Sequence, residues 1–116
     1  MFPYESLLVY QKAFKLNERI YQHIKKSFHL PIYVKSQLGR STLSIMLNIA
    51  EGSAKNTNKD RRNFFIIARA SAFECASILT FIASQGDFNE KESANLKEDL
   101  EQISRILYSM IKNLEK

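Results

Sequence analysis

Hydrophobic residues recur along most of the chain at the spacing of α-helices and separate into four runs. The first run has an apolar seam with intervals of three and four residues, made of Val9, Ala13, Leu16, Ile20 and Ile24. The last run has a similar seam, made of Leu96, Leu100, Ile103, Leu107, Met110 and Leu114. No stretch alternates apolar and polar residues as a half-buried β-strand does. The pattern therefore predicts four helices and no strands.

Local signals set the ends of these helices. Pro3 suits a helix entry, and Pro31 disfavours helical geometry in the residue before it. Thr57 or Asn58 can cap the third helix and Asn89 the fourth, and Gly52 with the polar run after it marks the end of the second helix or a tight bend. The expected helices span about residues 5–28, 32–55, 58–85 and 89–115. Four helices with short connections indicate a single-domain, all-α, antiparallel up-down-up-down four-helix bundle.

The second and third helices are apolar around more than half of their circumference. On the second helix, the polar residues from Gln37 to Lys55 occupy about a third of the surface at roughly 100° per residue. The third helix has phenylalanines and isoleucines on most sides between Phe64 and Ile82. Soluble monomers rarely leave large apolar patches open. Either bulky side chains inside the bundle cover this surface, or copies of the chain cover it; we expect a homo-oligomer.

Composition excludes several classes of protein. The 116 residues are 45% hydrophobic and 25% charged, which suits a folded domain and not a disordered chain. The single cysteine, Cys75, allows no internal disulfide, and its apolar surroundings indicate a buried, inert thiol. We see no signal peptide and expect a cytoplasmic protein. The apolar run 64–83 contains Arg69 and Glu74 near its middle, so we expect a buried helix and no membrane span.

Positive charge is concentrated in the first three quarters of the chain. The formal net charge is +5, whereas residues 87–116 carry seven acidic and five basic residues. Four cations share a face of the first helix, and five more lie on the second helix and the connection after it. The nucleic-acid-binding candidates are Lys12, Lys15, Arg19, Lys26, Arg40, Lys55, Lys59, Arg61 and Arg62. Such rows can follow a phosphate backbone without reading bases, and they can also be merely solvated.

Chemically reactive constellations are lacking in the sequence. Glu51 and Glu74 are the carboxylates in the most apolar settings, and we expect them to form structural ion pairs, Glu51 with Lys55. His23 and His29 do not follow a glutamate at the spacing of di-iron bundles, and no P-loop or catalytic-triad spacing occurs. We therefore expect no enzyme, no catalytic residue, no metal, no cofactor and no small-molecule substrate.

Several motifs resemble the bacterial four-helix bundle proteins encoded in intervening sequences of 23S ribosomal RNA genes. The matching segments are Leu8-Val9-Tyr10-Gln11-Lys12-Ala13, Gln37-Leu38-Gly39-Arg40-Ser41, Asn48-Ile49-Ala50-Glu51-Gly52 and the run from Phe64 to Ser71 with Glu74. The resemblance covers essentially the whole chain, and it implies a bundle that assembles as a ring, commonly a pentamer. The chain is also similar to the accessory protein of diversity-generating retroelements, a basic pentameric bundle that binds nucleic acid and a reverse transcriptase.

Together these observations predict a non-enzymatic, homo-oligomeric bundle that binds RNA or DNA through its phosphate backbone, and the resemblance implies that the oligomer is a pentamer. The alternative is a protein-interaction scaffold or accessory subunit that does not bind nucleic acid. The sequence does not specify the ring size, the natural ligand, any base specificity or the genomic context.

Overall fold

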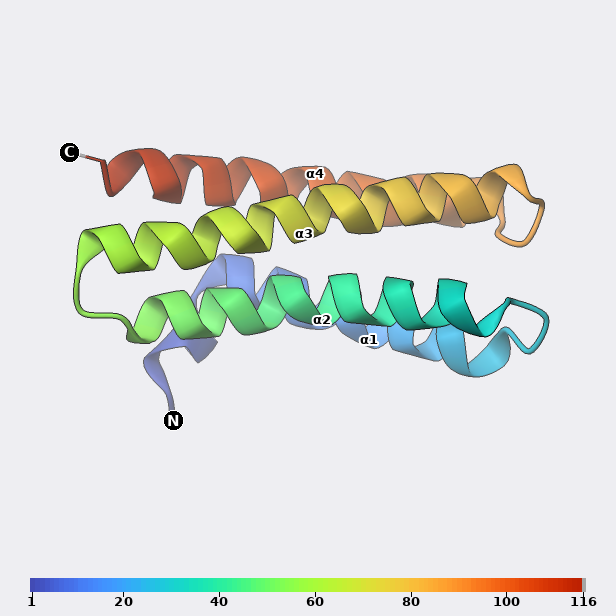
Figure 1. Cartoon of the computed structure of the whole chain (residues 1–116), viewed down its shortest axis with the longest axis horizontal. Coiled ribbons are helices and arrows are strands. Elements are labelled where there is room, and N and C mark those ends of the chain that lie inside the picture. Colours follow the sequence, from blue (N-terminus) through green and yellow to red (C-terminus); the bar gives the residue numbers. More distant parts are fainter. Residues whose placement is uncertain (116) are drawn as a thin grey trace.

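The computed structural model describes residues 1–115 and consists of four α-helices preceded by one short 3₁₀ helix. The elements are η1 (Pro3–Ser6), α1 (Leu8–Lys26), α2 (Ile32–Ala54), α3 (Asn58–Ser84) and α4 (Glu90–Asn113). Figure 1 shows the four helices lying side by side and antiparallel, in a bundle of 45 × 25 × 22 Å. No strand occurs among the described residues. The predicted all-α four-helix bundle is confirmed.

The helices contact one another in cyclic order. α1 contacts α2, α2 contacts α3, α3 contacts α4, and α4 closes onto α1. Within residues 1–115 no Cα atom of α1 lies within 8 Å of one in α3, and none of α2 lies within 8 Å of one in α4, so the diagonal helices face each other only across the core. The outer surface formed by α1 and α2 therefore lies on the opposite side of the bundle from the surface formed by α3 and α4. Contact is most extensive between α2 and α3, the two most apolar helices, and least extensive between α1 and α4.

The first helix begins later and ends earlier than the sequence predicts. Residues 3–6 form η1 instead, where the Phe2 N–H donates a 2.7 Å hydrogen bond to Glu5 Oε2. Leu7 then adopts extended backbone angles before α1 begins. At the other end, Ser27 leaves helical geometry, and its hydroxyl donates a 2.6 Å hydrogen bond to the His23 carbonyl oxygen. Side chain to backbone hydrogen bonds at both ends thus replace the outermost turns of the expected helix.

The other three helices start and stop within two residues of the predicted positions. The Thr57 hydroxyl accepts a 3.1 Å hydrogen bond from the Asp60 N–H at the start of α3. Asn89 Oδ1 accepts a 3.2 Å hydrogen bond from the Glu92 N–H at the start of α4. Each side chain satisfies one of the backbone donors that a helix N-terminus leaves free.

The predicted seams of the first and last helices form the core. The buried members are Val9, Ala13, Leu16 and Ile20 of α1, and Leu96, Leu100, Ile103 and Leu107 of α4. They pack with buried residues of the two central helices, which include Leu38, Ile45, Ile49, Phe65, Cys75, Leu79 and Ile82. Met110 and Leu114 of the predicted seam are only partly buried.

Two polar contacts fix the positions of α1, α2 and α3 relative to one another along the bundle. Asn17 Nδ2 of α1 donates a 2.8 Å hydrogen bond to the Thr42 carbonyl oxygen of α2. One further half-turn along α2, the hydroxyl oxygens of Ser44 and Ser71 lie 2.7 Å apart, which ties α2 to α3. These four residues therefore mark nearly one level along the bundle axis.

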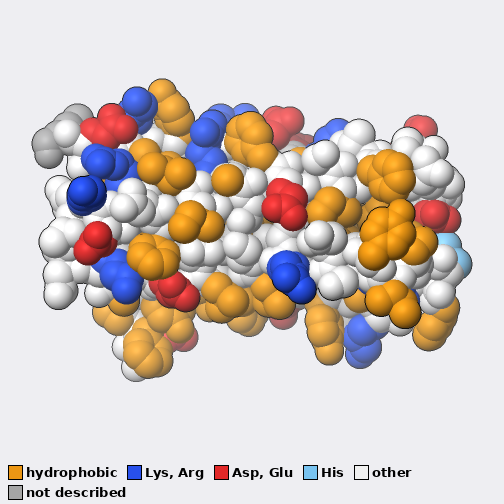
Figure 2. Space-filling model, viewed as in Figure 1, with side chains coloured by type: hydrophobic (Ala, Val, Ile, Leu, Met, Phe, Trp, Pro, Cys, Tyr) orange, Lys and Arg blue, Asp and Glu red, His pale blue; other side chains and the backbone are white. Residues whose placement is uncertain are grey.

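Large apolar side chains remain exposed on the single chain. On α2 and α3 six of them are between 45 and 58% exposed: Leu43, Leu47, Ile66, Ile67, Phe73 and Phe81. Figure 2 shows hydrophobic side chains spread over the face formed by α2 and α3, between isolated charged groups. Aromatic side chains of α1 and of the connection after it are exposed as well, namely Phe14, Tyr21 and Phe28.

By length and composition alone, α3 is the one helix among residues 1–115 that could cross a membrane. It has Arg69 and Glu74 near its middle and packs against both α2 and α4. A central helix of a packed bundle can have the same length and composition, so these two properties do not distinguish a bundle helix from a membrane span.

Candidate nucleic-acid interface

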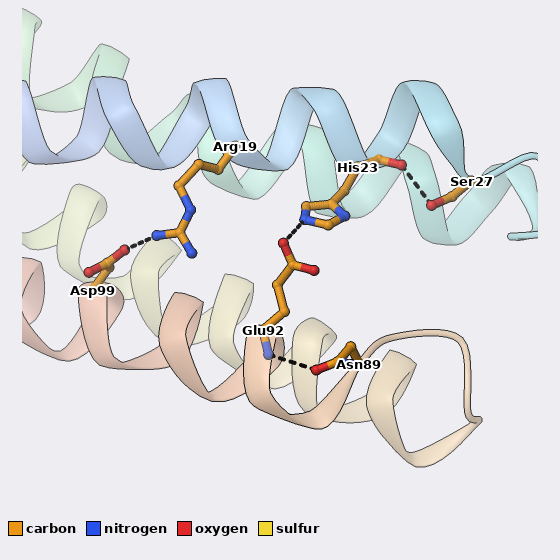
Figure 3. Close-up of polar contacts among 6 residues, drawn as sticks. All are labelled: Arg19, His23, Ser27, Asn89, Glu92 and Asp99. Carbon is orange, nitrogen blue, oxygen red and sulfur yellow. Dashed lines mark hydrogen bonds and ion pairs between the residues drawn. The ribbon is translucent and has the colours of Figure 1, made fainter.

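Two of the four cations predicted to form a basic row on α1 lie against α4. Lys12 Nζ donates a 2.9 Å hydrogen bond to Gln102 Oε1. Arg19 forms an ion pair with Asp99, as Figure 3 shows. The side chains of this ion pair are about 40% exposed, so solvent screens part of the charge. The basic row of α1 therefore faces the acidic helix α4, and two of its four cations contact a side chain of that helix.

The contact between α1 and α4 continues with a histidine. His23 Nε2 lies 2.5 Å from Glu92 Oε1, one turn along from the Arg19 ion pair (Figure 3). The Glu92 backbone N–H also donates a hydrogen bond to Asn89 Oδ1, the N-cap side chain of α4. Glu92 therefore takes part in the cap of α4 and also joins α4 to α1. The polar groups that hold these two helices together are therefore not free to contact a ligand.

The other predicted cations of α1 and α2 are open to solvent. Lys15 and Lys26 of α1 are exposed, and so is Arg40 of α2. None of the three forms an ion pair within the described part of the chain. They lie at different places along two helices, so they do not form a continuous basic surface on one chain.

The remaining four candidates lie at the junction of α2 and α3, Lys55 in the connection and the other three in the first turns of α3; we refer to Lys55, Lys59, Arg61 and Arg62 as the basic turn. Arg61 Nε donates a 2.8 Å hydrogen bond to the Lys55 carbonyl oxygen, which fixes the guanidinium against the end of α2. Lys55 Nζ lies 4.9 Å from the centre of the Phe64 ring. No member of the basic turn forms an ion pair with another residue in the range 1–115.

The basic turn lies at the end of the bundle that also holds the N-terminal segment and the end of α4 (Figure 1). Figure 2 shows Lys and Arg side chains at this end. A hollow of about 370 Å³ adjoins Arg61, lined also by Tyr4, Ser53, Phe65 and Asn113. This end of the molecule therefore combines fixed positive charge with an aromatic-lined depression.

The expected structural ion pairs of Glu51 and Glu74 do not form. Both side chains are exposed, and neither is part of an ion pair among residues 1–115. The neighbour expected for Glu51, Lys55, contacts the Phe64 ring instead. The reason is helical phase: both glutamates project from the outer sides of α2 and α3, so they are surrounded by exposed apolar residues and not by the core.

Arg69 of α3 is a cation that the charge pattern did not single out. Its guanidinium carbon lies 4.9 Å from the centre of the Phe73 ring and 5.2 Å from that of Tyr108. Its Nε atom is buried and has no hydrogen-bond partner among residues 1–115. The residue was missed because its sequence neighbours are apolar; its spacing of four from Phe73 was the available signal.

Side chains that could support catalysis are scattered. The described residues contain no group of three or more His, Cys, Asp or Glu that could hold a metal ion. Cys75 is buried, as predicted, and burial raises the pKa of its thiol to about 11. A thiol that stays protonated at neutral pH is a poor nucleophile.

The fold is that of a small four-helix bundle protein, and four cations gather in its basic turn. The sequence pattern of the 23S rRNA-intervening sequence protein family matches residues 5–109. The chain belongs to this family, as its motifs indicated.

A solved structure supports the fold. The chain resembles the crystal structure of a protein of unknown function from the S23 ribosomal protein family of Bacteroides thetaiotaomicron, with a TM-score of 0.84. The two chains are 24% identical over 90% of this chain and 99% of the other. No curated protein matches the chain.

Proposed function

We propose that the protein is a homo-oligomeric, non-enzymatic bundle that binds RNA or DNA through its phosphate backbone. The observation that carries this proposal is the basic turn. Four cations lie within eight residues, beside one acid, Asp60, and none of the four is used in an ion pair among the described residues. Phosphate contacts require only suitably spaced positive charges, so this surface suits binding without base specificity.

The exposed apolar side chains of α2 and α3 support the oligomer. Six large side chains there are about half exposed, more than a soluble single bundle usually leaves open. Closed symmetric assembly is the commonest way to cover such a surface. Symmetry would also bring copies of the basic turn to the same rim of the assembly, which multiplies its electrostatic attraction for a polyanion.

The binding of a labelled single-stranded RNA oligonucleotide at increasing salt tests the proposal. Wild-type affinity should fall steeply between about 50 and 200 mM salt, because binding releases counterions from the phosphates. The variant Lys59→Gln/Arg62→Gln removes two of the proposed phosphate contacts per chain. For each chain in contact with the RNA, it should reduce the slope of log K against log salt by about 1.4. Fluorescence anisotropy measures both quantities.

The acidic helix provides a matched control. Lys91→Gln/Lys97→Gln removes the same charge from α4, far along the chain from the basic turn, and should leave the slope unchanged. If both double variants weaken binding equally, the interaction reflects net charge only and the basic turn is not the site. If the wild-type oligomer binds no RNA even at low salt, the protein-interaction scaffold is the better interpretation.

A further inference from the structure

We propose that the arginine clamped between Phe73 and Tyr108 is a docking site for a second copy of the chain, and that Arg69 of one copy pairs with Glu18 of the next. The inference rests on the proposed homo-oligomer and specifies its contact. Both side chains belong to the described residues, and neither forms an ion pair there. The partner is argued from the surroundings of each residue and from their positions along the bundle.

Two aromatic rings orient the guanidinium of Arg69 so that it can bind an anion. The rings of Phe73 and Tyr108 flank the guanidinium at 4.9 and 5.2 Å, and such contacts keep its plane fixed while leaving the terminal NH₂ groups for a ligand. Its buried Nε lacks a hydrogen-bond partner, which is costly unless something completes the site. Lys112 Nζ lies 5.5 Å from the Tyr108 ring, so a second positive charge is near.

The walls around Arg69 favour a protein partner over a phosphate. A hollow of about 450 Å³ between α3 and α4 surrounds the residue, and Ile66, Phe73 and Ile111 contribute apolar walls. Phe73 also lines a second hollow farther along the same two helices. Lys112 and Glu115 also line the first hollow, but they pair with each other at 3.5 Å, so Arg69 is its cation without an ion pair among the described residues. Such a depression matches an apolar surface that carries one carboxylate.

Such a surface lies on the opposite side of the bundle. Between α1 and α2 a hollow of about 550 Å³ is lined by Phe14, Tyr21, Leu43 and Met46, with Glu18 at its edge. The first three of these apolar residues are between 46 and 60% exposed. Glu18 is itself exposed. The two depressions therefore have complementary charge and similar apolar character.

Two different surfaces on opposite sides of one chain make a heterologous contact, in which each copy uses one side for each neighbour. Repetition of that contact closes into a ring when the rotation allows it. If the ring axis runs along the bundle, rotation moves every residue to its new place without changing its level along that axis. Residues that meet across the contact must then lie at the same level.

Glu18 and Arg69 meet this condition. Asn17, next to Glu18, bonds to Thr42, and Ser44 bonds to Ser71, so the four residues lie at nearly one level. Arg69 precedes Ser71 by two residues, which places its backbone about 3 Å along α3 from that level, and its guanidinium carbon lies 4.9 Å from the ring of Phe73, which follows Ser71 by two residues. Its charged group therefore lies close to the level of Glu18.

Glu51 does not meet the condition. It follows Ser44 by seven residues, which places it about 10 Å beyond the level of Ser44 and Ser71 and, since α3 runs antiparallel to α2, about 7.5 Å beyond the backbone of Arg69. Packing agrees, because the adjacent Gly52 lies against Phe65 near the start of α3. Glu51 is exposed and unpaired like Glu18, so it is a matched control for the position of the carboxylate.

Exchange of the two charges tests the proposal, with sedimentation velocity as the measurement. Arg69→Glu and Glu18→Arg should each raise the apparent dissociation constant of the assembly more than about 30-fold, because each leaves like charges facing across the contact. The double variant should return that constant to within about tenfold of wild type. Glu18 is exposed and forms no ion pair among residues 1–115, so Glu18→Arg should keep the helical circular dichroism of wild type.

Three results would overturn the inference. Glu51→Arg, and not Glu18→Arg, could restore the assembly of Arg69→Glu. The single variants could assemble as wild type does, in which case the oligomer stands and other surfaces form it. Arg69→Glu could also assemble normally and lose RNA binding, which would make the clamped arginine a phosphate contact. A wild-type protein that sediments at 13.5 kDa at all concentrations would instead contradict the oligomer proposed above.

Discussion

At the scale of single residues, two of the glycines have opposite roles. A Cβ atom at Gly52 would lie 2.7 and 2.9 Å from two ring carbons of Phe65 and 3.1 Å from Phe64 Cβ. Gly52 therefore allows the end of α2 to approach the start of α3, beside the basic turn. At Gly39 the nearest side-chain atom would be 3.5 Å away, which is ordinary van der Waals contact.

Substitution of each glycine by alanine should separate these roles. Gly52→Ala should lower the free energy of unfolding by about 1–3 kcal/mol, because Phe65 is buried and cannot move aside without disturbing the core. Gly39→Ala should leave stability unchanged or raise it by up to about 1 kcal/mol, since alanine favours the helix. Urea titration measures both. Equal effects of the two substitutions would show that the approach of Phe65 to Gly52 is not tight.

Cys75 gives a prediction at alkaline pH. Burial raises the pKa of its thiol from 9.0 to about 11, so the unfolded chain releases this proton at a lower pH than the folded chain does. The native state therefore binds more protons between pH 9.0 and about 11, and its stability falls as the pH rises through that window. From pH 8 to pH 10.5 the thiol should contribute a loss of about 2 kcal/mol.

The variant Cys75→Ala serves as the reference for this effect. It should lose less stability over the same change in pH, because tyrosines and lysines titrate in both proteins and only the thiol differs. Urea unfolding of the two proteins at pH 8 and pH 10.5 measures the difference. Parallel losses in both proteins would show that the thiol ionises equally easily in the folded state.

At the scale of elements, periodicity and capping residues were enough to predict four helices. The starts of α3 and α4 were predictable, because the side chains of Thr57 and Asn89 accept hydrogen bonds from the backbone N–H groups three residues ahead. The start of α1 was not, because η1 depends on a hydrogen bond between Phe2 and Glu5 that apolar spacing does not reveal.

The cap of α4 should have a measurable effect on stability. Asn89→Ala removes the acceptor of the Glu92 N–H and should lower the free energy of unfolding by about 1 kcal/mol. Asn95 lies exposed inside the same helix, and Asn95→Ala should be neutral or slightly stabilising, because alanine is the better helix former. Urea titration of both variants checks the contrast, and a neutral Asn89→Ala would contradict a role for the cap.

The same scale explains why the candidate interface was only partly predictable. Helical spacing correctly placed Lys12 and Arg19 on one face of α1, but it does not say which helix packs beside that face. The structure places α4 there, and Gln102 and Asp99 contact the two cations. The basic turn was easier to predict, because its four cations are close together in sequence.

At the scale of the whole molecule, the chain leaves apolar surface on two opposite sides of the bundle. Phe14 and Leu43 line the hollow between α1 and α2, Phe73 lines hollows between α3 and α4, and Leu47 and Phe81 are exposed as well. A single dimer contact covers only one patch on each copy, whereas a ring covers two. The distribution of exposed apolar residues therefore favours a ring.

An oligomer that is more stable than its separate chains should melt at a temperature that depends on protein concentration. The melting temperature of the wild-type protein should rise when concentration increases a hundredfold, because assembly stabilises the folded state by mass action. Circular dichroism melts at several concentrations measure this. Glu18→Arg should show a weaker dependence, and an unchanging wild-type melting temperature would count against assembly coupled to folding.

The turn between α3 and α4 offers an attachment point. Both ends of the described chain and the basic turn lie at one end of a molecule 45 Å long, whereas this turn lies at the other (Figure 1). Gly86 has a φ of +79° and open space around it. A dye or surface tether placed on the exposed neighbour Gln85 would therefore project away from any nucleic acid held at the opposite rim, whereas a label on either terminus would compete with it for space.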